Sequence, residues 1–136
     1  GEGAEREAME NQARRLGITP FVIFAGMRED IAAHLRLCDL AVVSATDDSV
    51  SLAAVEALSA GVPLIATRVR GLSSVVRDGE NGILVPPGDA DALASAIIRV
   101  LRNPALRGEL TARINAAGRG GAFDQIADFP PRAVNG

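Results

Sequence analysis

Short, continuous apolar runs recur along the chain and alternate with stretches of helical periodicity. The runs cover residues 21–24, 40–43, 63–66 and 83–85. Continuous apolar runs of this length, bounded by glycine, proline and acidic residues, are typical of parallel strands buried on both faces. Because helices connect such strands, the pattern predicts an α/β fold, a doubly wound parallel sheet of about four strands with helices on both faces.

Residues 44–71 form the centre of this pattern. A helix is predicted from about Ser51, which can cap its start, to Ala60, and Gly61 then supplies a left-handed stop. One face of this helix carries the apolar residues Leu52, Val55 and Leu58. In a strand–helix–strand unit, the loop after the first strand opens at the crevice where ligands bind. Residues 46–50 occupy that loop, so they are the first candidates for a functional site.

Further helices are predicted outside this unit from their periodicity and end signals. They cover residues 4–16, 31–38, 72–76, 90–101 and 105–117. The side chains predicted to face inward from the first two are Met9, Ala13, Leu16, Ile31, Leu35 and Cys38. Asp89 is interpreted as the cap of the helix that begins at Ala90. Residues 118–136 contain GRGG and FPPR and are expected to be irregular, which places the end of the domain at residue 117.

Composition narrows the classes of function. The chain has 136 residues, enough for one domain, and a net charge of −3, and all 14 of its basic residues are arginine. This balance, with aromatic residues at 3%, argues against a nucleic-acid partner. The single cysteine, Cys38, forms no internal disulfide, so a reducing, cytoplasmic setting is expected. No run of about 18 apolar residues predicts a membrane span.

Other catalytic signatures are absent from the sequence. It has no P-loop and no zinc spacing, and we expect neither a metal nor a cofactor. His34 is the single histidine and has no acidic or serine partner in any motif, so we interpret it as a surface or boundary residue.

The central unit resembles the nucleotide-sugar domain of retaining glycosyltransferases of the family 4 type, which have the GT-B fold. The family's pattern reads S-x-x-E-G-F-G-x-x-x-L-E-A-x-A-x-G-x-P-V-I-A. The positions that match it in order are Ser44, Glu56, Ala57, Ala60, Gly61, Pro63 and Ala66. The family's two acids, separated by seven residues, fall on Asp48 and Glu56. The resemblance implies a Rossmann-like half of a GT-B enzyme over residues 1–117.

The resemblance also implies roles for particular residues. Asp48 would lie near the donor sugar and its diphosphate, and Glu56 would accept hydrogen bonds from ribose hydroxyls. The loop after the 21–24 run would contact the nucleobase, which makes Gly26, Met27 and Arg28 base-site candidates. The remaining donor-binding candidates are Ser49, Val50, Ser51, Leu52, Arg70 and Gly71. The partner is then a nucleoside-diphosphate sugar.

The chain departs from the family's pattern at several of these positions. Residues 49–51 read Ser-Val-Ser where the family has Gly-Phe-Gly, and Arg70-Gly71 stands where it has Gly-Gly. Ser74 stands where the family has Glu. Arg70 either obstructs the close approach of the diphosphate or holds it through its guanidinium, and a solvated side chain is a third reading.

Parts of the family's enzyme are not found in this sequence. The resemblance places its start at about the second strand of the nucleotide-sugar domain, so the first strand and the acceptor-binding N-terminal domain are missing. We therefore expect the isolated chain to be inactive. For the full enzyme, the resemblance also allows peripheral membrane association.

Three functions remain open from the sequence. The first is the donor-binding domain of a retaining glycosyltransferase. The second is a non-catalytic nucleotide-binding or interaction module derived from such a domain, and the altered motif residues favour it. The third is a sugar-nucleotide epimerase of the GT-B fold, whose members resemble residues 44–71 poorly.

Overall fold

The computed structural model describes residues 3–119, which divide between two compact units. The first unit, Gly1–Ile31, contains the helix α1 (Arg6–Arg15) and the 3-10 turn η1 (Thr19–Phe21). The second, Ala32–Gly136, contains the sheet. The expected irregular tail from residue 118 and the opening Gly-Glu-Gly lie largely outside the described residues.

In the first unit, two predictions are wrong, one about which side chains of α1 are buried and one about a strand. Only Ala13 of the expected inward face of α1 is buried, whereas Met9 and Leu16 are exposed. The predicted strand over residues 21–24 is absent as well. Phe21 ends η1, Val22 is extended, and no neighbouring strand pairs with this run among the described residues. An apolar run without a strand beside it has no ladder of hydrogen bonds to join.

The described part of the second unit contains a three-stranded parallel sheet in the order β1-β2-β3, one strand fewer than predicted. Its strands are β1 (Ala41–Val43), β2 (Leu64–Thr67) and β3 (Gly82–Val85). Every residue of the central strand β2 is buried, as a strand covered on both faces requires. β1 has β2 as its one neighbour, and Val42 is 42% exposed, so the prediction that this strand is buried on both faces is wrong.

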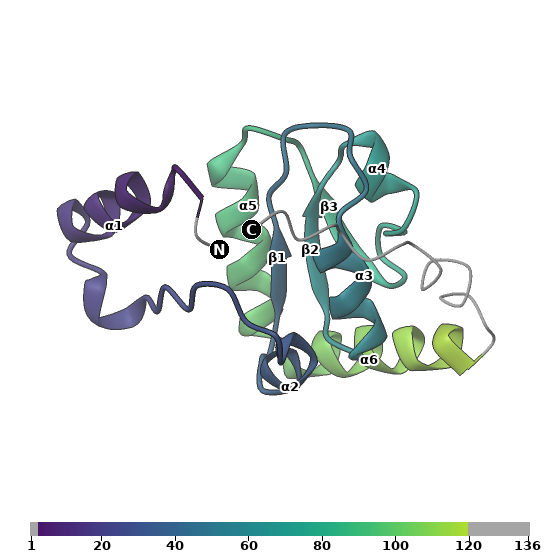
Figure 1. The fold of residues 1–136 in the computed structure, drawn as a ribbon. Coiled ribbons are helices and arrows are strands. Elements are labelled where there is room, and N and C mark those ends of the chain that lie inside the picture. Colours follow the sequence, from purple (N-terminus) through teal and green to yellow (C-terminus); the bar gives the residue numbers. More distant parts are fainter. Residues whose placement is uncertain (1–2, 120–136) are drawn as a thin grey trace. The chain divides into compact units, whose positions relative to one another are not determined.

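Two helices cover opposite faces of the sheet (Figure 1). On one face, α3 (Leu52–Ser59) packs Val55 and Leu58 against Leu64 and Ala66 of β2. On the other face, α5 (Ala90–Leu101) packs Val100 into a cluster with Ile65. Because side chains alternate along a strand, β2 serves both clusters. The predicted doubly wound α/β arrangement is therefore confirmed.

Three further helices are present. They are α2 (Ile31–Arg36), α4 (Arg70–Ser73) and the C-terminal α6 (Pro104–Arg119). Ile114 of α6 packs into the cluster under α3. The helix α4 begins two residues before the predicted 72–76 helix. Within residues 3–119, no helix combines the length and apolar character needed to cross a membrane.

The predicted ends of α3 are confirmed, whereas several side chains that were predicted to face inward are exposed. Ser51 caps α3 by accepting a hydrogen bond from the Ala54 amide at 3.4 Å, and Gly61 has φ of +76°. Leu52, predicted to share the buried face, is 41% exposed, so this part of the prediction is wrong. Cys38, predicted to be buried, is exposed, and Ile31 is exposed too.

Candidate functional site

The candidate site lies where the parallel strands β1 and β2 end side by side. Their register pairs Val43 with Ala66, so the chain leaves both strands at the same edge of the sheet. The first exit, residues 44–51, leads into α3 and contains Asp48. The second exit, residues 68–69, leads into α4. In open α/β sheets, the carboxyl edge is where ligands bind.

Contacts across this edge fasten the two exits to one another. The Thr67 hydroxyl donates to the Ala45 carbonyl at 2.5 Å, and the Arg70 amide donates to Asp48 Oδ1 at 2.8 Å. A Cβ atom on Gly71 would lie 2.2 Å from the carbonyl oxygen of Ser49, so this position has room for glycine alone. Together these contacts, which we call the loop clasp, hold residues 45–49 against residues 67–71.

Within the loop, Asp47 and Ser49 form a local turn. The Ser49 amide donates to Asp47 Oδ1 at 2.9 Å, and the Ser49 hydroxyl donates to the same oxygen. The hydroxyl contact, and after it the amide contact, lower the pKa of the exposed Asp47 carboxyl below its ordinary value. The Ser49 amide is therefore already paired and does not face an open site.

The start of α3 presents a different set of amides. Within the described chain, no hydrogen bond engages the amides of Val50, Ser51 and Leu52. Unpaired amides at a helix start attract anions, because the helix macrodipole adds to their partial charge. Glu56 follows in the middle of α3 and is half-buried, between the buried residues Val55 and Ala57.

The structure thus brings most of the predicted site residues to one edge. Asp48, Ser49, Arg70 and Gly71 belong to the loop clasp, and Arg70 is exposed. The base-site candidates lie in the first unit, where Gly26 has φ of +70°, Met27 is exposed and Arg28 Nε donates to the Ala25 carbonyl at 3.1 Å.

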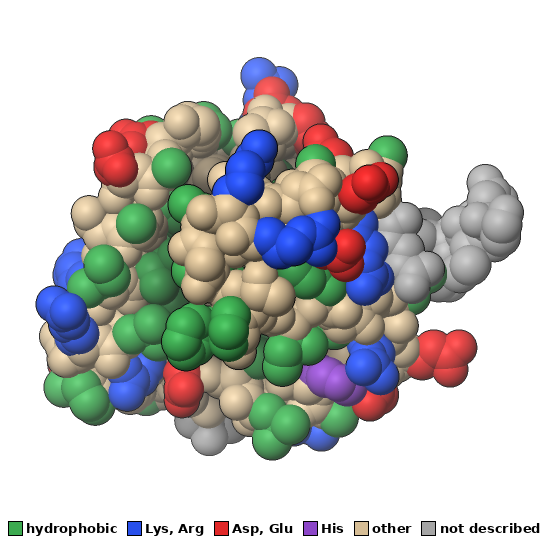
Figure 2. Space-filling view, turned by 90° about the vertical axis from the view of Figure 1, so that its left-hand side faces the viewer, with side chains coloured by type: hydrophobic (Ala, Val, Ile, Leu, Met, Phe, Trp, Pro, Cys, Tyr) green, Lys and Arg blue, Asp and Glu red, His purple; other side chains and the backbone are tan. Residues whose placement is uncertain are grey.

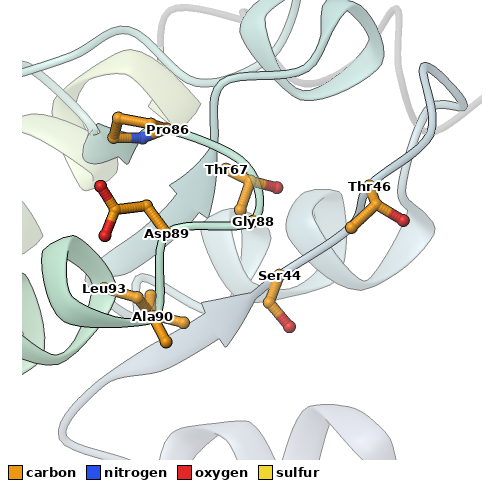
Figure 3. Close-up of a pocket in the computed structure, with 8 residues that line it drawn as sticks. All are labelled: Ser44, Thr46, Thr67, Pro86, Gly88, Asp89, Ala90 and Leu93. Atoms are coloured by element: carbon orange, nitrogen blue, oxygen red, sulfur yellow. The ribbon is translucent and has the colours of Figure 1, made fainter.

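A hollow of about 240 Å³ lies at the same carboxyl edge, on the side of α5 (Figure 3). Its lining residues are Ser44, Thr46, Thr67, Pro86, Gly88, Asp89, Ala90 and Leu93. Asp89 caps α5, as predicted, by accepting from the Ala92 amide at 2.9 Å. Thr67 is not among the site residues predicted from the sequence, although its place at the end of the central strand is a signal that could have identified it.

The structure shows no group of three or more metal-ligating side chains among residues 3–119. His34, the single histidine of the sequence, is exposed, and its purple side chain is visible at the surface in Figure 2.

Comparison with known proteins shows to which family this chain belongs. A family model described as "Glycosyl transferases group 1" matches residues 1–103, which is most of the chain. The chain belongs to this glycosyltransferase family. The lipopolysaccharide core biosynthesis glycosyltransferase LpsE of Rhizobium meliloti is 34% identical over 113 residues, covering 83% of this chain and 33% of LpsE. The D-inositol 3-phosphate glycosyltransferase of Acidothermus cellulolyticus is 40% identical over 108 residues, covering 78% of this chain and 24% of that enzyme.

Solved structures agree with the family assignment. The crystal structure of Anabaena HepE in complex with UDP-glucose matches with a TM-score of 0.80 and 28% identity, covering 94% of this chain and 37% of HepE. The glycosyltransferase domain therefore has the architecture of one half of a GT-B enzyme. It spans about a third of the length of LpsE.

Proposed function

We propose that this chain is the donor-binding domain of a glycosyltransferase that takes its sugar from a nucleoside-diphosphate sugar, with retention, as in the family 4 type. The observations that support the proposal are the acidic loop at the carboxyl edge of the sheet, where Asp48 accepts from the Arg70 amide, and the unpaired amides that open α3. Asp48 lies in the loop, the amides open α3, and Glu56 follows within the same helix. The match to a glycosyltransferase family supports this proposal, and so does the likeness to the Anabaena HepE structure, which was solved in complex with UDP-glucose.

Each group has a chemical role in the proposal. Glu56 accepts hydrogen bonds from the ribose hydroxyls, and Asp48 lies near the sugar and the diphosphate. The unpaired amides of Val50, Ser51 and Leu52 face the diphosphate, whose negative charge grows as the sugar departs. Oriented amides stabilise that charge without rearranging at the moment of reaction.

Arg70 and the base-site residues extend the proposal. The Arg70 side chain is exposed beside the loop clasp, and its guanidinium can hold two diphosphate oxygens at once. Gly26, Met27 and Arg28 contact the nucleobase. Transfer would further need the acceptor-binding N-terminal domain and the first strand of this domain. We place the complete enzyme in the cytoplasm, and the family resemblance allows its peripheral association with a membrane.

A second candidate is a non-catalytic nucleotide-binding module. The Ser49 amide favours it, because Ser49 is one of the predicted donor-binding residues and its amide is already bonded to Asp47. A module of this kind would bind nucleotide but would not transfer sugar after it was joined to an acceptor domain.

Amide chemical shifts of the 136-residue chain during titration with UDP-glucose, GDP-mannose and ADP-glucose test the proposal. We expect one of these donors to shift the amides of residues 48–52 and 56 and to leave those of α6 unchanged. Shifts confined to α6, or no shifts with any of the three donors, would contradict the proposal.

A further inference from the structure

Thr67 is a buried polar side chain that no predicted role uses. It ends β2, the central strand, and is 3% exposed. Its side chain points to the same face of the sheet as Ile65, toward α5, and lines the hollow there (Figure 3). A buried hydroxyl without a hydrogen-bond partner is costly. The Thr67 hydroxyl has such a partner, because it donates to the Ala45 carbonyl at 2.5 Å.

This hydrogen bond is the contact of the loop clasp nearest the strands. It joins residues 22 positions apart, one just after β1 and the other at the end of β2. The second contact, from the Arg70 amide to Asp48, lies three residues further along the loop. Between β1 and α3, residues 44–51 form no helix or strand, so these contacts define the path of the loop.

The path of the loop determines where the proposed donor-binding groups lie. Asp48 and the amides of Val50 and Ser51 follow Ala45 by only a few residues. If the Ala45 carbonyl loses the Thr67 hydroxyl as its donor, the peptide group of Ala45 can rotate toward other partners. The loop residues that follow Ala45 would then be displaced as well. Catalytic and binding groups lose much of their effect when they are misplaced by about 1 Å.

We propose that Thr67 is a positioning residue of the nucleotide-sugar site, which holds the acidic loop through its hydroxyl and does not touch the donor. This inference rests on the proposed function and adds a residue to it. Thr67 acts through Ala45, so its effect depends on the hydroxyl group and not on the methyl group.

Two matched pairs of chains separate the hydroxyl from the packing. Thr67→Val replaces the hydroxyl with a methyl group of similar size, while the wild type keeps it. Thr67→Ala and Thr67→Ser both lack the methyl group and differ from one another only in the hydroxyl. Thr111→Val in α6, far along the chain from the loop clasp, is the control for a threonine-to-valine change.

The dissociation constants of UDP, GDP and ADP are measured by calorimetry for each chain, and hydrogen exchange is measured at the Arg70 amide. We expect Thr67→Val to weaken the best nucleotide about fivefold, the size of one neutral hydrogen bond, and to speed exchange at Arg70. Thr67→Ala should bind more weakly than Thr67→Ser by a similar factor. Thr111→Val should match the wild type.

The outcomes distinguish this inference from the proposed function. If Thr67→Val does not fold, the Ala and Ser pair still decides the role of the hydroxyl. Equal nucleotide affinity within both pairs, with a wild type that binds, would overturn the positioning role alone. A wild type that binds none of the three nucleotides would overturn the proposed function, and the positioning role would fall with it.

Discussion

Two apolar runs that were both predicted to be strands, residues 21–24 and 63–66, have opposite fates in the fold. In the first, Phe21 and Ile23 are 84% and 90% exposed and no strand forms. In the second, Leu64, Ile65 and Ala66 are completely buried between β1 and β3. The difference shows that an apolar run becomes a strand when neighbouring backbone can complete its hydrogen bonds. Composition alone does not distinguish the two cases.

The largest effect expected from this comparison is on stability. Ile65→Ala removes a completely buried side chain from the cluster under α5 and should lower the free energy of unfolding by about 3 kcal/mol. Ile23→Ala, the matched change in the exposed run, should alter it by less than about 0.5 kcal/mol. Urea denaturation followed by circular dichroism measures both. Equal losses for the two variants would mean that residues 21–24 are packed in solution.

The next largest effect is also on stability, and it tests whether the segments that follow β1 and β2 are packed as closely as the sheet. Gly71→Ala would place a Cβ atom 2.2 Å from the Ser49 carbonyl oxygen, and relieving this clash should cost roughly 1–3 kcal/mol. Gly108→Ala in α6 is the control, because nothing lies within 4 Å of its added atom. The control should gain up to about 1 kcal/mol from helix propensity. Two variants with the same thermal midpoint would show that the loop clasp is loose.

The smallest effect concerns the exposed turn that Asp47 and Ser49 form within the loop. Ser49→Ala removes the hydroxyl donor but keeps the amide donor, so the pKa of Asp47 should rise part of the way toward its ordinary value. Because the folded-state pKa is lowered, the turn stabilises the fold above the unfolded-state pKa, and this contribution is lost as the pH falls through the folded value.

Carbon-13 shifts of the Asp47 carboxyl group, followed against pH, measure this change. Ser95→Ala on α5 is the control and should leave the titration of Asp47 unaltered. Coinciding midpoints in the wild type and Ser49→Ala would exclude the hydroxyl as the cause.

Local signals in the sequence predicted local structure well. Asp89 and the periodicity after it predicted α5 and its cap, and Ser51 and Gly61 predicted both ends of α3. The apolar runs at β2 and β3 were correctly predicted to be strands. They form strands because each of them has a neighbouring strand with which to pair.

Features that depend on distant residues could not be predicted in this way. Leu52 is 41% exposed although it shares the helical period of Val55 and Leu58, because periodicity does not encode which part of the helix is covered by the rest of the fold. The bonds of Asp48 and Thr67 join segments 22 positions apart and follow from the parallel register. The family resemblance selected Asp48 and Glu56 for their chemistry, whereas the engagement of the Ser49 amide by Asp47 depends on the turn geometry.

The role of Glu56 is the central claim about the site. Glu56 follows the unpaired amides at the start of α3, and the residue as a whole is half-buried. Hydrogen bonds from ribose hydroxyls to its charged carboxylate would be charge-assisted. Glu56→Gln keeps the shape and helix propensity but removes the charge. Glu109→Gln on the exposed side of α6 is the matched control.

The decisive measurement is a calorimetric titration of the wild type, Glu56→Gln and Glu109→Gln with ribo- and 2′-deoxyribonucleoside diphosphates. We predict that the wild type and Glu109→Gln prefer the ribose form. Glu56→Gln should bind it about tenfold more weakly, equivalent to about 1.4 kcal/mol, and should lose the preference. Equal affinity of the wild type and Glu56→Gln for both nucleotides would remove Glu56 from the site and contradict the donor-binding assignment.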